Sequence, residues 1–583
     1  MIPLLLALLA QSQDANRLTY LDESDPYYVH RKFPKLVTPQ WVGEDGVEAV
    51  VVLAIDDMRG HDKWEAYLRP ILERLKKIDG RAPVSIMTCT IDPNHPHLQK
   101  WLKEGLNIEV HTVDHPCPLL QGGDFAKAKS TYDRCVDLMN LIPNNKPVAF
   151  RMPCCDSLNT PSPRFYAEIF NRTTPHGNFL SIDTSVFNIT TPNDPDLPKE
   201  LTTDADGKEK FRKYLPFPSF VNTIEDYPYP YVIGKLCWEF PCIVPSDWEA
   251  QHLLKPFNPQ MIADLKAALD AVVTKKGTFN LVFHPHGWIK AEQVVELIDY
   301  AVEKHGDKVM FLTFREALER LNRNFLGGHP LRDERGGDNR SRILDINNDG
   351  YLDVLAGDKT RLWSPREKRW VEMERPSGML DPNLAFGVVR PDGFASVVTS
   401  AREAWNFDGK KWAPDSFLAG EVYGSYDGCP ATRFRDLDGD GRCELITAFR
   451  ERKIIWSWDG SAWHDLPFRV PDGLAFVDQQ ASPPRFGDAG LRFVDLNGDG
   501  RPDIVFSNEK EWSVHVFKDM KVGWEKVAGG KQGEEGAIPM IVRNGTNNGA
   551  WFHSKHLWVQ NEDTAKMPNL VDRRSFEQLL EKK

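Results

Sequence analysis

The 583-residue sequence lacks several features that would fix its class at once. No apolar run approaches the roughly 20 residues that a membrane-spanning helix needs, so we expect no transmembrane segment. Nine cysteines are too few for a disulfide-stabilised scaffold, although Cys237 could pair with Cys242, or Cys429 with Cys443. Basic residues (72) are fewer than acidic residues (84), and the resulting charge of −12 argues against nucleic acid as a partner.

The chain begins with the apolar segment MIPLLLALLA at residues 1–10, which polar residues follow. This segment resembles the hydrophobic core of an export signal, although the usual basic start is missing. We therefore predict a signal peptide at residues 1–10 and an exported protein, either periplasmic, cell-surface or secreted. A buried N-terminal segment of the fold is the alternative.

Short apolar runs alternate with helical patterns from residue 47 to about residue 324. Such runs between amphipathic helices indicate a parallel sheet covered on both faces. We predict an α/β domain at residues 11–325 with a distorted (β/α)7 TIM-like barrel and a long insertion at residues 187–257. The seven predicted strands are residues 49–55, 84–87, 107–110, 148–150, 179–182, 279–283 and 309–314.

The pattern changes to repeats beyond a Gly- and Arg-rich linker at residues 326–342. The segments 345–353, 436–444 and 495–503 share one nine-residue template, and an apolar run follows each. Pairs of aromatic residues seven positions apart, such as Trp363 and Trp370, recur further along each unit. Repeats of this length predict an all-β domain at residues 343–565, folded as a β-propeller of about five blades, and a helical tail at residues 566–583.

Polar residues follow the predicted strands of the first domain where each strand ends. Because the carboxyl ends of parallel strands meet at one rim, we expect these residues to converge there. Two imidazoles and one carboxylate can hold a divalent metal ion and leave a position for water. A metal-activated water, a carboxylate base and an imidazole acid suit hydrolysis of an amide or ester, with no organic cofactor. The residues at the rim are Asp56, Asp57, His111, His115, Arg151, Asp183 and His284.

The ordered segments AIDD (54–57), HTVDH (111–115), RMP (151–153), IDTS (182–185) and LVFHPHG (281–287) resemble the motifs of the NodB-type polysaccharide deacetylase family. The resemblance spans about residues 47–324.

The resemblance implies a role for each rim residue. Asp56 would be the general base and Arg151 would orient it. Asp57, His111 and His115 would bind zinc or another divalent transition metal ion. His284 would be the general acid, tuned by Asp183.

The repeat loops offer a different metal chemistry. Their oxygen side chains lie at alternate positions, and clustered carboxylates repel one another unless a hard cation such as calcium neutralises them. The loops resemble those of FG-GAP/VCBS repeats, the integrin-type family, which implies calcium sites; solvent-exposed acidic turns are the alternative. The predicted ligands are Asp345, Asn347, Asp349, Asp353, Asp436, Asp438, Asp440, Glu444, Asp495, Asn497, Asp499 and Asp503.

These patterns together predict an exported carbohydrate esterase that removes acetyl groups from an N- or O-acetylated polysaccharide. A non-catalytic glycan-binding or adhesion protein with a degenerate barrel is one alternative. A related amidohydrolase acting on small amides or cyclic imides is another. The repeat domain could bind a glycan or a protein.

Overall fold

The computed structural model describes residues 15–21, 31–155, 162–215, 223–421, 431–449, 452–478 and 485–581. The predicted signal peptide and Cys429 lie outside the described residues. No helix within these ranges combines the length and the apolar character that crossing a membrane requires.

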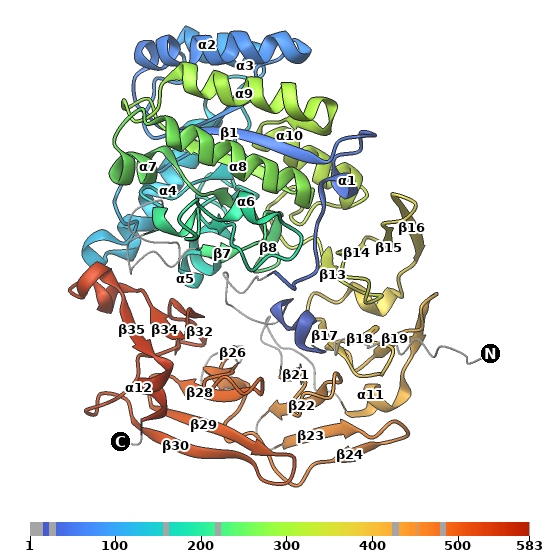
Figure 1. The fold of residues 1–583 in the computed structure, drawn as a ribbon. Coiled ribbons are helices and arrows are strands. Elements are labelled where there is room, and N and C mark those ends of the chain that lie inside the picture. The colour runs from blue at the N-terminus through green and yellow to red at the C-terminus, as the bar shows by residue number, and fades with distance from the viewer. Residues whose placement is uncertain are drawn as a thin grey trace.

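The described residues of the first domain contain one sheet of nine strands (Figure 1). Its order is β8-β9-β5-β4-β3-β2-β1-β11, and β12 pairs with the start of β1. Neighbouring strands are parallel except β8 and β9. All seven predicted strands contribute to this sheet. Its strands are β1 (Ala49–Met58), β2 (Val84–Thr88), β3 (Asn107–Val110), β4 (Ala149–Phe150), β5 (Ile182–Asp183), β8 (Tyr231–Ile233), β9 (Cys237–Glu239), β11 (Thr278–Phe283) and β12 (Val309–Phe311).

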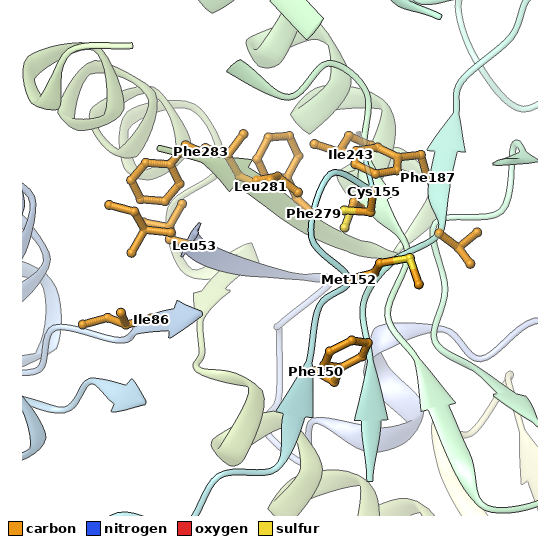
Figure 2. Packing of buried hydrophobic residues seen from close by; sticks show 14 of the residues in the cluster. Leu53, Ile86, Phe150, Met152, Cys155, Phe187, Ile243, Phe279, Leu281 and Phe283 are labelled. Carbon is orange, nitrogen blue, oxygen red and sulfur yellow. The ribbon is translucent and has the colours of Figure 1, made fainter. Parts of the chain in front are cut away.

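Helices connect these strands, as the alternating pattern predicts. The apolar stripe of α2 is buried in the main core at Trp64, Leu68 and Leu72. Figure 2 shows the strand side of this core, where Leu53, Phe283 and their neighbours pack together. The helices are α1 (Thr38–Trp41), α2 (His61–Asp79), α3 (Pro96–Glu104), α4 (Phe125–Asn140), α5 (Pro163–Phe165), α6 (Lys199–Thr202), α7 (Asp247–Leu254), α8 (Pro259–Lys275), α9 (Ala291–His305) and α10 (Phe314–Arg320).

The prediction of a closed barrel is wrong for the described residues, because the end strands β8 and β11 do not pair. The insertion at residues 187–257 supplies the reason. Its strand β10 (Cys242–Ile243) pairs with β6 (Phe187–Ile189), which also pairs with β7 (Thr223–Glu225), in a separate small sheet. The side-chain amide of Asn280 on β11 donates to the carbonyl oxygen of Phe240 at 2.9 Å. A side chain thus bridges the gap that a backbone ladder would close.

The repeats form successive sheets, antiparallel except where β22 pairs with β25, which confirms the all-β prediction (Figure 1). The first, second and fourth units are four-stranded, and in the third β25 and β26 join the four strands β21–β24. No closed ring is shown, so the propeller stays a prediction. The strands are β13 (Arg342–Leu344), β14 (Asp353–Ala356), β15 (Lys359–Ser364), β16 (Arg369–Glu374), β17 (Ala385–Val388), β18 (Ala395–Val398), β19 (Ala404–Phe407), β20 (Trp412–Pro414), β21 (Thr432–Arg435), β22 (Glu444–Phe449), β23 (Arg452–Trp458), β24 (Trp463–Asp465), β25 (Ala475–Asp478), β26 (Arg485–Asp488), β27 (Leu491–Val494), β28 (Asp503–Ser507), β29 (Glu511–Asp519) and β30 (Gly523–Lys531). Helix α11 (Ser416–Glu421) follows β20.

The C-terminal part of the chain differs from the predicted helical tail. Strands β33 (Ala550–His553), β34 (His556–Val559) and β35 (Asp572–Ser575) form a three-stranded sheet, and the short pair β31 (Val542–Arg543) and β32 (Thr546–Asn547) precedes it. Only α12 (Phe576–Leu580) is an α-helix within residues 566–581. The tail therefore adds a strand to the sheet instead of forming a separate helical segment.

The aromatic pairs lie across hairpins within the sheets. Trp363 is directly opposite Trp370, with ring centroids 5.3 Å apart. In the second and third units the residues opposite the later tryptophan, Trp412 and Trp463, are Phe407 and Trp458. Cross-strand packing of this kind stabilises a sheet and needs no bound sugar.

The segment Ala15–Leu21 corrects the predicted domain boundary at residue 11. Ala15 and Leu18 belong to the buried cluster of the repeat domain, and the sulfhydryl of Cys443 donates to the carbonyl oxygen of Ala15 at 3.4 Å. The Arg17 guanidinium lies 3.7 Å from a carboxylate oxygen of Asp345. This segment therefore packs on the repeats and not on the α/β domain.

Candidate active site

The acidic doublet lies at a β-bulge near the end of β1, where pairing with β2 shifts register between Ile55 and Met58. Asp57 has a φ of 70°, which few residues other than glycine adopt without strain. A bulge re-aims neighbouring side chains, so the two carboxylates have different surroundings. Asp56 is buried and accepts a hydrogen bond from Arg151 Nη1 at 2.7 Å. Asp57 instead faces three imidazoles.

Asp57, His111 and His115 form the predicted ligand set, since one ligand atom from each lies within 4.8 Å of the others. Asp57 Oδ1 is 2.6 Å from His115 Nε2 and 3.4 Å from His111 Nε2. This oxygen is buried yet accepts no hydrogen bond. A carboxylate oxygen without a donor, facing two imidazole nitrogens, fits a divalent metal ion with open coordination positions.

His111 is also fixed from behind. Its Nδ1 lies 2.8 Å from the carbonyl oxygen of Arg151, which sets the ring orientation and leaves Nε2 toward Asp57. Thr112 and His115 both have positive φ values, 62° and 50°, so the loop after β3 turns sharply to bring the second imidazole back.

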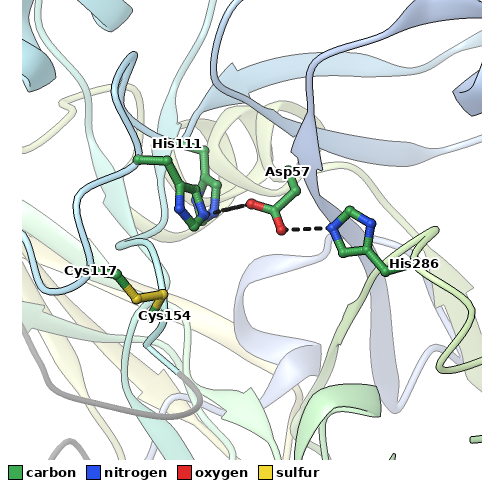
Figure 3. The surroundings of a disulfide bond; sticks show 6 residues. Asp57, His111, Cys117, Cys154 and His286 are labelled. Atoms are coloured by element: carbon green, nitrogen blue, oxygen red, sulfur yellow. Dashed lines mark hydrogen bonds and ion pairs between the residues drawn. A yellow bond between two sulfur atoms is a disulfide. The ribbon is translucent and has the colours of Figure 1, made fainter.

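A disulfide joins the loops that follow two of the motifs (Figure 3). Cys117 and Cys154 are bonded, 37 residues apart, with their Cα atoms separated by 5.7 Å. Nothing in the spacing of the cysteines indicates this pair, and the candidate pair Cys237 and Cys242 is not bonded. The bond ties the loop of His115 to the loop of Arg151, so it constrains the ligand loop and the residue that contacts the base together.

Arg151 is completely buried, and its guanidinium makes several hydrogen bonds. Besides Asp56, it donates to the carbonyl oxygen and the hydroxyl of Thr184, both at 3.0 Å, and to Asn280 Oδ1 at 3.3 Å. Burial opposes its charge, but the Asp56 carboxylate outweighs this and raises the pKa of Arg151. Arg151 therefore holds Asp56 from one side.

His284 is oriented by Asp247, a residue that sequence analysis missed. Asp247 accepts from the backbone N–H of His284 with one oxygen and contacts His284 Nδ1 with the other, both at 2.8 Å. Burial raises the pKa of Asp247, and His284 opposes that rise. Asp247 is the first residue of α7, in the irregular insertion. The sequence Ser246–Glu249 does carry a capping-box pattern that marks the helix start, but not its partner.

Asp183 does not occupy the position expected of it beside His284. Its side chain accepts from the Tyr166 hydroxyl at 2.6 Å and from the Ser185 hydroxyl at 2.8 Å. It also lies directly across from Glu239 on β9, and both carboxyl groups are fully buried. Burial raises the pKa of both groups, and the charge of Asp183 raises that of Glu239 further. Asp183 therefore bonds with groups inside the sheet, and the carboxylate that contacts the His284 imidazole is that of Asp247.

His286 contacts the other oxygen of Asp57. Its Nε2 lies 2.9 Å from Asp57 Oδ2, on the side of the carboxylate away from His111 (Figure 3). His286 and His284 lie with their ring centroids 5.6 Å apart. The two histidines of the fifth motif thus contact different carboxylates: His286 contacts Asp57, and His284 contacts Asp247.

The repeat loops differ from one another. Within the described chain, only the second loop gathers three acidic side chains closely, with ligand atoms of Asp436, Asp438 and Glu444 within 4.8 Å of one another. Burial raises the pKa of Asp436 to about 6 and that of Glu444 to about 8. Asp440 instead accepts from Arg442 Nε at 2.9 Å.

In all three loops the leading carboxylate accepts backbone N–H groups, and in the second loop Asp436 accepts from Gly441 at 2.9 Å. Asp345 accepts from Gly350 at 3.1 Å, and Asp495 accepts from Gly500 at 2.9 Å. The remaining predicted ligands of the first and third loops bond within their own turns or strands, as Glu444 does when it accepts from the backbone of Leu437 in the second loop. Asn347 donates to Asp349, Asn497 donates to Asp499, and Asp353 and Asp503 accept from the backbone of Ile346 and Leu496.

Comparison with known proteins agrees with both resemblances. Residues 43–162 match the family model of polysaccharide deacetylases, and residues 436–506 match that of FG-GAP-like repeats. The first match contains the first three motifs, and it indicates a carbohydrate esterase, as the motifs predict. No protein with a curated description matches the sequence.

Several solved structures are similar to about half of the chain. Puue allantoinase is 12% identical over 51% of this chain and 97% of its own, with a TM-score of 0.33. Peptidoglycan deacetylase PdaC from Bacillus subtilis is 16% identical over 48% and 95%, with a TM-score of 0.27. The catalytic domain of peptidoglycan N-acetylglucosamine deacetylase from Eubacterium rectale is 14% identical over 46% and 88%, with a TM-score of 0.25. By sequence, residues 43–162 are thus similar to polysaccharide deacetylases, and residues 436–506 are similar to FG-GAP-like repeats.

Proposed function

We propose that this chain is a metal-dependent hydrolase that removes acetyl groups from an N- or O-acetylated polysaccharide. The observation that carries the proposal is the juxtaposition around Asp57. Its orphaned oxygen faces His111 and His115, and the neighbouring carboxylate of Asp56 is held by a buried arginine. The match of residues 43–162 to the deacetylase family supports the same chemistry.

Asp57, His111 and His115 would hold a divalent transition metal ion, with zinc the first choice for such a ligand set. When bound, the ion would polarise the acetyl carbonyl group and make a water molecule easier to deprotonate. His286 would keep the second oxygen of Asp57 turned away from the ligand cluster, since it contacts that oxygen at 2.9 Å.

Asp56 would accept the proton of the attacking water. One of its oxygens is bonded to Arg151, which fixes the carboxylate plane and directs the other oxygen to the reacting group. As the bond from the acetyl carbon to the sugar nitrogen or oxygen breaks, His284 would donate a proton from Nε2 to that leaving atom. Asp247 keeps Nδ1 engaged, so Nε2 is the nitrogen left for this transfer. The products are acetate and the deacetylated sugar.

Export of the chain fits two features. The Cys117–Cys154 disulfide is stable in an oxidising compartment, and open oxygen-ligand loops of weak calcium affinity fill only outside the cytosol. Calcium in the repeat loops would be structural. We propose that it binds in the second loop, where three acidic side chains converge.

Acetate release from a panel of acetylated chitin, xylan and peptidoglycan fragments, with small amides and cyclic imides alongside, tests the proposal. Asp56→Asn is the matched variant, because it keeps the shape and one contact to Arg151 but removes the base. We expect polymer deacetylation by the wild type and a loss of at least about 100-fold in the variant. Equal rates would refute the mechanism, glycan binding without acetate release would indicate the adhesion alternative, and turnover confined to small amides would indicate the amidohydrolase.

A further inference from the structure

A pocket of about 310 Å³ opens beside the proposed metal site. Its lining residues are Asp57, Arg59, Gly60, Lys63, Trp64 and His286. Asp57 and His286 belong to the site already described, so the pocket begins where the acetyl group would react. Its volume is at the lower end for small-molecule sites, which suits a single sugar unit. The other four residues carry no role in the proposed chemistry.

Two of these residues are cations without a carboxylate partner. Arg59 and Lys63 are exposed, and neither forms an ion pair within the described residues. Other cations of helix α2 are engaged: Arg69 pairs with Glu65 at 2.7 Å, and Lys76 pairs with Glu104 at 2.6 Å. In a chain with a charge of −12, two unpaired cations on one pocket wall form a local field opposite to the net charge.

The acidic groups near the pocket do not cancel this field. The charge of Asp57 would be compensated by the metal ion that it binds with His111 and His115, and His286 Nε2 lies 2.9 Å from its other oxygen. Asp62 is exposed and contacts His97 Nε2 at 3.1 Å, outside the pocket lining. The start of α2 adds to the field, because Gly60 supplies no side-chain cap for the first N–H groups.

We propose that this pocket is a subsite for an anionic group on the sugar next to the one that is deacetylated. This inference rests on the proposed function and narrows its substrate to an acidic acetylated polysaccharide. The anionic group could be a uronate carboxylate or a sulfate ester, which share charge and hydrogen-bond acceptors. Arg59 would provide a planar donor pair and Lys63 a point charge, while Trp64 closes the apolar side.

The test measures binding separately from catalysis. Dissociation constants are measured by calorimetry for three oligosaccharides of equal length without acetyl groups: one neutral, one containing uronate and one sulfated. Wild-type protein should bind at least one anionic oligosaccharide about tenfold more tightly than the neutral one. Raising the salt from about 0.05 to about 0.5 M should reduce that preference, because exposed charges are screened. The anionic oligosaccharide with the lower dissociation constant identifies the group that the subsite binds.

The double variant R59Q/K63Q should reduce the preference to about twofold or less. Lys77→Gln is the matched control, because Lys77 is an exposed residue of the same helix near its opposite end, and it should keep the wild-type preference. Equal wild-type affinity for neutral and anionic oligosaccharides, or a preference retained in the double variant, would overturn the subsite. Absence of acetate release from any acetylated form, with the preference intact, would overturn the proposed function alone.

Discussion

The exchange of Asp247 for asparagine is the sharpest test of the site, because it separates the structural partner of His284 from the one expected from the motif. Asp247 uses its two oxygens for two different donors of His284, the backbone N–H and Nδ1, both at 2.8 Å. An asparagine has only one oxygen. Its NH₂ group must face one of the two donors, so Asp247→Asn loses one bond and the charge that strengthens the other.

The magnitude follows from these two bonds. A hydrogen bond to a charged group contributes about 1.5–3 kcal/mol. Losing one at a residue that must present its other nitrogen to the leaving atom raises the barrier by a similar amount, which lowers kcat by about 10- to 100-fold. The alkaline limb of the kcat–pH profile should also move to lower pH, because the protonated imidazole loses its negative neighbour.

The assay is the initial rate of acetate release as a function of pH, with thermal melting as a check on folding. Asp183→Asn is the matched comparison, since Asp183 is equally buried but contacts Tyr166 and Ser185. It should leave the alkaline limb in place. If Asp247→Asn keeps the wild-type profile while Asp183→Asn moves it, the partnership read from the structure is incorrect.

Three further changes test other parts of the molecule. His111→Ala should abolish stoichiometric transition-metal binding, because it removes one of three clustered ligands; elemental analysis that still finds full metal content would exclude this ligand set. Calcium chelation should lower the Tm of the full chain, since Glu444 and its neighbours then repel one another. The variant Asp436→Asn should lose most of that Tm shift. An equal shift in the wild type and in the variant would contradict the site. Burial raises the pKa of Glu109 from 4.5 to about 7, so the folded protein loses stability as the pH rises from 4.5 to 7 and the buried carboxyl group must ionise. Glu109→Gln removes this ionisation. Denaturant unfolding should therefore show a free energy of unfolding that is higher by about 3 kcal/mol at pH 8 and little changed at pH 4. A gain of similar size at both pH values would show that the charge of Glu109 is not the cause.

The convergence of the metal ligands and the base was predictable from sequence because each residue ends a strand. Asp57 and His111 follow apolar runs, and parallel strands deliver their carboxyl ends to one edge whatever the details of packing. His115 follows at a distance that a single turn of chain can span. The positions of these residues therefore follow from the order of the strands, which the hydrophobic pattern already predicts.

Asp247 had no such signal. It lies in the insertion at residues 187–257, where the described strands are two or three residues long and β6, β7 and β10 pair outside the main sheet. Its contact with His284 joins positions 37 residues apart. The same irregular segment prevents closure of the barrel, since β10 pairs with β6 and leaves Asn280 to bridge the gap with its side chain. Apolar runs predict that strands exist, but they do not determine which neighbour each strand finds.

The repeat domain packs directly against the α/β domain and is not joined to it by the linker alone. Trp551 and Trp558 of its last sheet belong to the same buried cluster as the α/β core. A Cβ added at Gly123 would lie 2.5 Å from the Ala565 side chain, so the two surfaces meet at backbone distance. Arg164, which follows the third motif, forms an ion pair with Glu562.

The linker shows the same close association. Arg332 is buried and donates to the carbonyl oxygens of Phe170 and Leu180, at 3.0 and 2.7 Å. The first repeat sheet contacts the other end of the α/β domain, where Gln40 donates to the carbonyl oxygen of Leu352 at 2.9 Å. Both ends of the repeat domain therefore share buried surface with the α/β domain.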